Sequence, residues 1–230
     1  MAELKRERPH AWDSTWEGVF RAREWGRYPP EELVRFIGGN YFSAPDRGRV
    51  RFLEIGSGAG ANVWFLAREG FDVHGIDGSP SAIQQATARM RQERCTATLA
   101  VADAIDVAET YPAEYFDAII DIACLQCHDV PTMRRIVENA RGLLKPAGRF
   151  FSMLLAAGSF GDGIGAQIDR GTYSSVKTGP LKGLGTSHFS TLRDAKTLFS
   201  RFSSCEIEYS ERSVDNRSAR YRHWVIQAVR

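Results

Sequence analysis

Short apolar runs alternate with amphipathic stretches between residues 50 and 155 of this chain. The apolar runs, which we expect to be strands, cover about residues 50–55, 71–76, 96–101, 116–122 and 149–155. The amphipathic stretches predict helices at about residues 61–69, 80–93 and 131–144. Strands that alternate with helices indicate βαβ units. The nearly unbroken apolar run at 116–122 is typical of a strand covered on both faces. The pattern therefore predicts an α/β fold around a mostly parallel sheet.

The two ends of the chain follow other patterns. Residues 9–40 have a helical period that the prolines at 29 and 30 interrupt, and we expect residues 1–45 to form a helical cover. Residues 156–189 are rich in Gly, Ser and Thr and have no helical period, which is typical of a lid or binding loop. A helix at 191–201, with Ser190 as its N-cap, should follow. The alternating runs at 205–209 and 224–229 predict two antiparallel strands, which completes a single domain over residues 1–230.

Length and charge exclude several classes of protein. A chain of 230 residues is long enough for one continuous core. Its 30 Lys and Arg residues nearly balance 28 Asp and Glu residues, so we expect no general attraction to nucleic acid or membrane. No apolar run reaches the roughly 18 residues that span a bilayer, and residues 1–10 lack the apolar centre of a signal peptide. These features predict a cytoplasmic protein.

The cysteines do not indicate a disulfide framework or a metal site. Cys95, Cys124, Cys127 and Cys205 are few and scattered. Cys124 and Cys127 form a C-x-x-C pair, but the sequence has no second pair that would complete a zinc site. We therefore expect no bound metal.

The strongest chemical signal is the glycine-rich segment from Glu54 to Gly60, which leaves the first strand and enters a helix. Its glycines permit a sharp turn and close approach of a ligand, and the helix that follows offers unpaired N–H groups. Asp77 ends the second strand, where a carboxylate can accept hydrogen bonds from both hydroxyls of a ribose. Asp103 follows the third strand, where a carboxylate can accept a hydrogen bond from the exocyclic amine of adenine. These features predict an adenosine-containing ligand.

The spacing of the glycines and the charge of Glu54 distinguish between two such ligands. A dinucleotide fold uses G-x-G-x-x-G, whereas this chain has glycine at 56, 58 and 60 and an acidic residue two positions before the first. A carboxylate there would repel a pyrophosphate, but it complements the ammonium and sulfonium charges of S-adenosylmethionine. The residues therefore favour the methyl donor over NAD.

These ordered motifs resemble those of the class I S-adenosylmethionine-dependent methyltransferases. The resemblance covers residues 50–155 and includes Phe116-Asp117 and the turn from Leu143 to Gly148, where Ala147 stands at a position that is most often glycine. It implies a Rossmann-like seven-stranded sheet in the order 3-2-1-4-5-7-6, with strand seven antiparallel. The stretch from Gly70 to Asp77 is similar to small-molecule members of that class.

The resemblance also implies where the methyl donor binds. The glycine loop would hold the methionine part, Asp77 the ribose and Asp103 the adenine, with Gly78 and Ala104 packed near the ring. The aromatic pair Trp25 and Tyr28 could also reach the methyl donor, although core packing is the alternative. The full set of candidate donor-binding residues is Glu54, Gly56, Ser57, Gly58, Gly60, Asn62, Asp77, Gly78, Asp103, Ala104, Trp25 and Tyr28.

Candidate residues for catalysis lie on the acceptor side, near the ends of the fourth and fifth strands. Asp121 interrupts an apolar run, where a carboxylate is costly unless it binds the reactants or makes a structural hydrogen bond. His128 begins the next loop, and histidine suits a general base, although a surface or capping role is the alternative. His188, at the end of the 156–189 segment, is the candidate for contact with the acceptor.

The predicted reaction is methyl transfer from S-adenosylmethionine to a small molecule, which leaves S-adenosylhomocysteine. The segments 25–29 and 223–225 are similar to bacterial methyltransferases of sugar and polysaccharide biosynthesis, which implies a sugar or another biosynthetic intermediate as acceptor. One alternative is an enzyme that acts on RNA or protein, and another is a non-catalytic protein that only binds S-adenosylmethionine. We expect a monomer or a homodimer.

Overall fold

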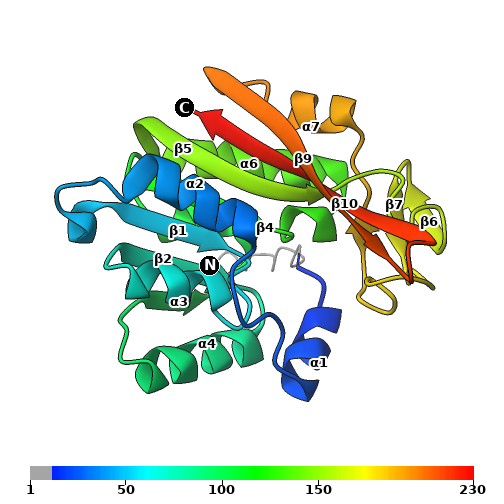
Figure 1. Cartoon of the computed structure of the whole chain (residues 1–230), viewed down its shortest axis with the longest axis horizontal. Helices are drawn as coiled ribbons and strands as arrows, with labels where there is room; N and C mark the ends of the chain where they lie inside the picture. Colours follow the sequence, from blue (N-terminus) through cyan, green and yellow to red (C-terminus); the bar gives the residue numbers. More distant parts are fainter. Residues whose placement is uncertain (1–11) are drawn as a thin grey trace, which may run out of the picture.

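The computed structural model describes residues 12–230, so the charged stretch at 1–10 and the first part of the predicted cover lie outside it. A seven-stranded sheet in the order β3-β2-β1-β4-β5-β10-β9 forms its centre (Figure 1). The strands are β1 (Arg51–Ile55), β2 (Asp72–Asp77), β3 (Thr98–Val101), β4 (Phe116–Ile122), β5 (Leu144–Leu155), β9 (Ser204–Val214) and β10 (Ala219–Val229). Strand β10 is antiparallel to both of its neighbours. The predicted fold class and strand order are confirmed.

Helices cover both faces of this sheet. One face carries α2 (Glu31–Tyr41), α3 (Ala61–Arg68) and α4 (Pro80–Gln92), and the other carries α5 (Val107–Thr110), α6 (Val130–Leu143) and α7 (Leu192–Leu198). Helix α1 (Thr15–Ala22) lies beside α4, away from the centre of the sheet (Figure 1). Short 3₁₀ turns occur at η1 (Arg47–Arg49), η2 (Ala104–Asp106) and η3 (Leu125–Cys127). In residues 12–230 no helix has both the length and the hydropathy to cross a bilayer.

The apolar runs of the central strands supply two separate cores. Side chains alternate across a strand, so Ile119 and Phe150 enter the core formed with α6 and α7. Their chain neighbours Ile120 and Phe151 enter the core formed with α2 and α3. All four are fully buried, which explains why these strands are apolar at nearly every position.

Helix boundaries follow local capping. Ser79 caps α4 by accepting a hydrogen bond from the backbone N–H of Ala82, with Pro80 as the first helical residue. The predicted cap of α7 was wrong by one residue. Thr191 and Asp194 form a reciprocal capping box, whereas the N–H of Ser190 donates to the carbonyl of Leu155.

The segment 156–189, predicted to be a lid or binding loop, has secondary structure of its own. It contains a three-stranded antiparallel sheet of β6 (Ala166–Asp169), β7 (Thr172–Ser174) and β8 (Ser187–His188). An apolar cluster of its own supports it, formed by Leu155, Val176, Leu181, Leu184, Phe189 and Tyr221. These strands are too short, and in part too polar, for hydrophobic period to indicate them from sequence.

Candidate functional site

The glycine loop turns sharply between β1 and α3. Gly56 and Gly60 adopt left-handed backbone angles, with φ of 68° and 79°. A Cβ at Gly56 would lie 2.5 Å from Sγ of Cys124, and one at Gly60 would lie 2.9 Å from Cβ of Ala86. Both conformation and space therefore require glycine at these two positions.

Glu54 is the most unusual residue beside this loop, because its carboxyl group is almost completely buried. Its Oε1 accepts a hydrogen bond of 2.6 Å from Nδ2 of Asn62, which lies in the first turn of α3. The structure contains no partner within residues 12–230 for Oε2 of Glu54, Oδ1 of Asn62 or Oγ of Ser57. Buried polar atoms are normally hydrogen-bonded, so three such atoms at one turn indicate a place for a polar ligand.

Asp77 joins the ends of two strands to the loop. Its Oδ2 accepts from the backbone N–H of Gly58 at 2.8 Å, and its Oδ1 accepts from the N–H of Ser79 at 2.8 Å. Burial raises the pKa of Asp77, although both hydrogen bonds oppose that shift. Each carboxylate oxygen can accept a second hydrogen bond, so both can also bind a ribose hydroxyl.

Asp103 lies at the corresponding end of β3 and faces the N-terminal segment. Its Oδ1 accepts from the N–H of Ile105 at 3.1 Å, and its Oδ2 accepts from the N–H of Trp12 at 3.2 Å. The indole of Trp12 lies directly against Gly78, where a Cβ would come within 2.5 Å of it. Trp12 therefore contacts two of the residues predicted to lie near adenine, Asp103 and Gly78.

Three further contacts hold the N-terminal segment over the glycine loop. Glu17 of α1 accepts hydrogen bonds from the hydroxyls of Ser79 at 2.5 Å and Ser81 at 2.6 Å. These two hydroxyls lower the pKa of Glu17 to about 2. The Phe20 ring lies 3.2 Å from the position of a Cβ on Gly58. Helix α1 thus forms a cover over the predicted methyl-donor site.

The two aromatic residues predicted to reach the methyl donor lie in different surroundings. Tyr28 is 69% exposed, and its ring packs edge-on against Trp64 of α3. Trp25 packs edge-on against Trp16, with their ring centroids 5.6 Å apart. Trp25 also packs against the apolar cluster that includes Ala59 of the glycine loop, and Trp12 is the tryptophan that lies against Gly78. The sequence pattern did not distinguish among these aromatics, because each is spaced suitably for packing.

Asp121, in β4, makes a complete set of internal hydrogen bonds. Its Oδ1 accepts from the N–H groups of Cys124 at 2.9 Å and Leu125 at 3.0 Å, and its Oδ2 accepts from Oγ of Ser152 at 2.5 Å. Burial raises the pKa of Asp121 to about 6, against the effect of these bonds. The carboxylate therefore fixes the turn after β4, which presses Cys124 against Gly56.

The two candidate histidines lie on neighbouring segments, because β8, which contains His188, contacts η3, which His128 directly follows. His128 is buried and directly follows η3, and its N–H donates to the carbonyl of Leu125. His188 is buried in β8, with Nδ1 2.8 Å from Oγ1 of Thr172. Burial lowers the pKa of His188, which favours its neutral form. No structural observation tests their predicted roles, which stay predictions.

Comparison with known proteins identifies the domain. Residues 52–148 match the family model described as a methyltransferase domain. Over these residues the chain is similar to methyltransferase domains. This match covers the glycine loop, Asp77, Asp103 and Asp121. It agrees with the predicted family, and the solved structures of similar fold include S-adenosylmethionine-dependent methyltransferases.

The domain is also similar to individual proteins. It is 35% identical over 98 residues to a demethylmenaquinone methyltransferase of Tropheryma whipplei. The matched region is 42% of this chain and 38% of the relative. The chain thus spans well under half of that curated relative. An S-adenosylmethionine-dependent methyltransferase of Methanosarcina mazei is 22% identical with a TM-score of 0.62, covering 78% of this chain and 92% of the other. A magnesium protoporphyrin IX methyltransferase of Synechocystis with bound S-adenosylmethionine is 11% identical with a TM-score of 0.57, covering 94% and 80%.

The buried carboxyl of Glu54 leads to a prediction on pH dependence. Burial raises its pKa from 4.5 to about 8, so between these values the folded protein keeps a proton that the unfolded chain releases. The free energy of unfolding should therefore fall as pH rises through this window, by at most about 1.4 kcal/mol per pH unit from this group. Glu54→Gln mimics the neutral carboxyl and should reduce the slope by that amount. Urea unfolding from pH 5 to pH 8 measures it, and equal slopes for variant and wild type would contradict the prediction.

Proposed function

We propose that this chain transfers the methyl group of S-adenosylmethionine to a small-molecule acceptor. The observation that carries the proposal is the set of unsatisfied polar atoms on Glu54, Ser57 and Asn62 at the glycine loop. The carboxylate of Glu54 can bind the ammonium group of the methionine part, and the hydroxyl of Ser57 can donate a hydrogen bond to its carboxylate. Asp77 and Asp103 follow at the ends of the next two strands, in the places where ribose and adenine would be held.

The residues of the chain act on the reaction mainly by positioning. When bound, S-adenosylmethionine supplies an activated methyl carbon, and displacement at that carbon needs alignment with the acceptor and exclusion of water. Asp77 anchors the loop through the N–H of Gly58 and can hold the ribose hydroxyls at the same time. Phe20 lies against Gly58 of the loop, and Trp12 lies against Gly78 after β2. Asp121 holds the turn that forms the opposite wall.

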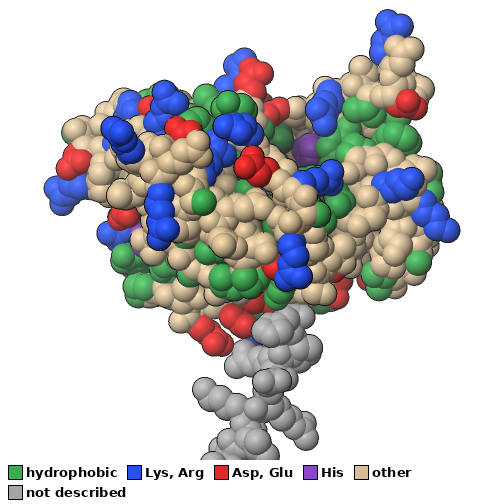
Figure 2. All heavy atoms as spheres, turned by 90° about the horizontal axis from the view of Figure 1, so that it is seen from below, with side chains coloured by type: hydrophobic (Ala, Val, Ile, Leu, Met, Phe, Trp, Pro, Cys, Tyr) green, Lys and Arg blue, Asp and Glu red, His purple; other side chains and the backbone are tan. Residues whose placement is uncertain are grey.

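The surroundings of the proposed acceptor region support a small organic molecule, such as a sugar or another biosynthetic intermediate. Trp16 and Trp25 pack against the apolar cluster of the 156–189 segment. Figure 2 shows Lys and Arg side chains separated by acidic and neutral surface on one face, which does not resemble a continuous surface for RNA. The demethylmenaquinone methyltransferase acts, by its name, on a small molecule.

Two measurements test this function. Calorimetric titration should detect binding of S-adenosylmethionine, with release of protons near pH 7, because a nearby cation favours ionised Glu54. Release of S-adenosylhomocysteine with a panel of sugars, quinols and other small acceptors should then identify turnover. Absence of binding would refute the proposal, and binding without turnover on small molecules, RNA or protein would favour a non-catalytic role.

Replacing His128 tests the proposed general base. We expect His128→Gln to lower kcat by about 100-fold or more while the affinity for S-adenosylmethionine stays within twofold, because general bases contribute about 10²–10⁴ in rate. His74→Gln is the matched control, since His74 is also buried but lies in β2 and contacts Asp72. Equal kcat values for the His128 variant and the wild type would remove His128 from the mechanism.

A further inference from the structure

A groove outside the methyl-donor site lies between α6, α7 and the β6–β7 turn. It has a volume of about 400 Å³. Its walls are formed by Val130, Met133, Arg134, Arg170, Ser190, Arg193, Asp194, Thr197 and Leu198. None of these residues belongs to the glycine loop or to the strand ends that carry Asp77 and Asp103. The groove is therefore separate from the proposed methyl-donor site.

Positive charge dominates this groove. Arg134, Arg170 and Arg193 come from three different elements, α6, the β6–β7 turn and α7. Arg170 pairs with Asp194 at 2.9 Å, whereas the described part of the chain provides no acidic partner within ion-pair distance for Arg134 or Arg193. Two guanidinium groups in the groove are therefore not neutralised, and guanidinium groups match carboxylate and phosphate in geometry.

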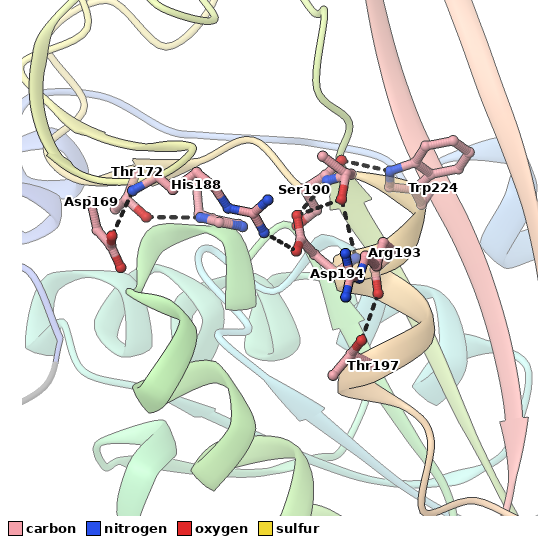
Figure 3. Close-up of polar contacts among 10 residues, drawn as sticks. Asp169, Thr172, His188, Ser190, Arg193, Asp194, Thr197 and Trp224 are labelled. Atoms are coloured by element: carbon pink, nitrogen blue, oxygen red, sulfur yellow. Dashed lines mark hydrogen bonds and ion pairs between the residues drawn. The ribbon is translucent and has the colours of Figure 1, made fainter.

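Asp194 cannot neutralise these two arginines, because its carboxylate already makes other contacts. Its Oδ2 accepts from the N–H of Thr191 at 2.9 Å and from the hydroxyl of the same residue at 2.6 Å. Its Oδ1 accepts from Arg170. Figure 3 shows Asp194 between Ser190 and Arg193 at the start of α7. The acidic residue of the groove thus serves to cap α7.

His188 provides a second, independent observation. It is only 1% exposed, and Figure 3 shows its ring between Thr172 and Asp194, one of the residues that line the groove. Nδ1 lies 2.8 Å from Oγ1 of Thr172, but Nε2 has no hydrogen-bond partner in residues 12–230. When the Thr172 hydroxyl donates to Nδ1, Nε2 carries the proton and becomes a buried donor behind the groove wall. An unsatisfied buried donor is costly unless an acceptor binds near it.

We propose that this groove binds a small molecule through a phosphate or carboxylate group. Arg134 and Arg193 hold the anion from two walls. Nε2 of His188 donates either to the anion or to Asp194 when Arg170 turns from Asp194 toward the anion. The proposal does not depend on methyl transfer, since none of the residues that line the groove is a predicted donor-binding residue.

Titration with inorganic phosphate and with succinate, at constant ionic strength, tests the site and distinguishes the two anions. We expect one of them to bind the 230-residue chain and shift the ¹⁵N resonance of His188 Nε2. The double variant Arg134→Gln/Arg193→Gln should weaken binding at least about tenfold, since each charge-assisted hydrogen bond contributes about that factor. Arg35→Gln/Arg201→Gln is the control, because it removes the same charge from exposed ion pairs with Glu31 and Glu138.

The outcomes separate this proposal from the proposed function. If the groove variant and the control variant weaken anion binding equally, the effect is due to overall charge and the proposed site is wrong. The site is also wrong if the wild type binds neither anion. Titration of S-adenosylmethionine into the groove variant should give the wild-type affinity. Anion binding without S-adenosylmethionine binding would refute the methyl-transfer proposal and leave the groove intact.

Discussion

The Asp77→Ala variant is expected to bind S-adenosylmethionine at least about 100-fold more weakly than the wild type. Its carboxylate is placed to accept two hydroxyls of the ribose, and hydrogen bonds to charged groups contribute about 1.5–3 kcal/mol each. The same carboxylate accepts from the N–H groups of Gly58 and Ser79, so its removal also loosens the glycine loop. Calorimetric titration of both proteins measures the difference in affinity.

A control from the same strand isolates this effect. Asp72 begins β2 and forms an ion pair with Arg51 at 2.7 Å, at the opposite end of the strand from Asp77. Asp72→Ala removes the same group but should leave the affinity for S-adenosylmethionine within about twofold, since surface ion pairs contribute little. Similar affinities for the Asp77 and Asp72 variants would show that Asp77 does not bind the ribose.

Asp121→Ala should lower the free energy of unfolding by about 2–4 kcal/mol, which is a large effect for a single substitution. The change leaves the buried N–H groups of Cys124 and Leu125 and the hydroxyl of Ser152 without their acceptor. Part of this loss is offset because burial makes the ionised carboxylate unfavourable above its pKa of about 6. Urea unfolding at pH 7 measures the change.

Asp121→Asn distinguishes a positioning role from a catalytic one. The amide oxygen can replace Oδ1 as acceptor for both N–H groups, and the NH₂ group can donate to Ser152. We expect stability within about 1 kcal/mol of the wild type and a retained kcat. A stable variant that binds S-adenosylmethionine normally but loses kcat by about 100-fold would instead identify Asp121 as a general base.

The methyl-donor half of the site could be predicted from the sequence because its parts lie at the ends of consecutive strands. Parallel strands place their carboxyl ends at one edge, so Glu54, Asp77 and Asp103 must come together once β1, β2 and β3 are neighbours. The burial of Glu54 and the turn geometry of Gly56 follow from the same local pattern. The contacts of Trp12 and Glu17 could not be predicted, since they join an N-terminal segment to distant turns.

The sequence by itself determined the α/β class, the strand order through its family motifs, and the place of the carboxylates predicted to bind adenosine. These features depend on local hydrophobic period and on short motifs, which act over a few residues or one βα unit. Only the tertiary structure decided that Trp12 lies on Gly78, that Asp121 is satisfied internally, and that residues 156–189 form a sheet. It also brought Arg134, Arg170 and Arg193 around one groove. Such contacts depend on how separate elements pack, which hydrophobic period does not specify.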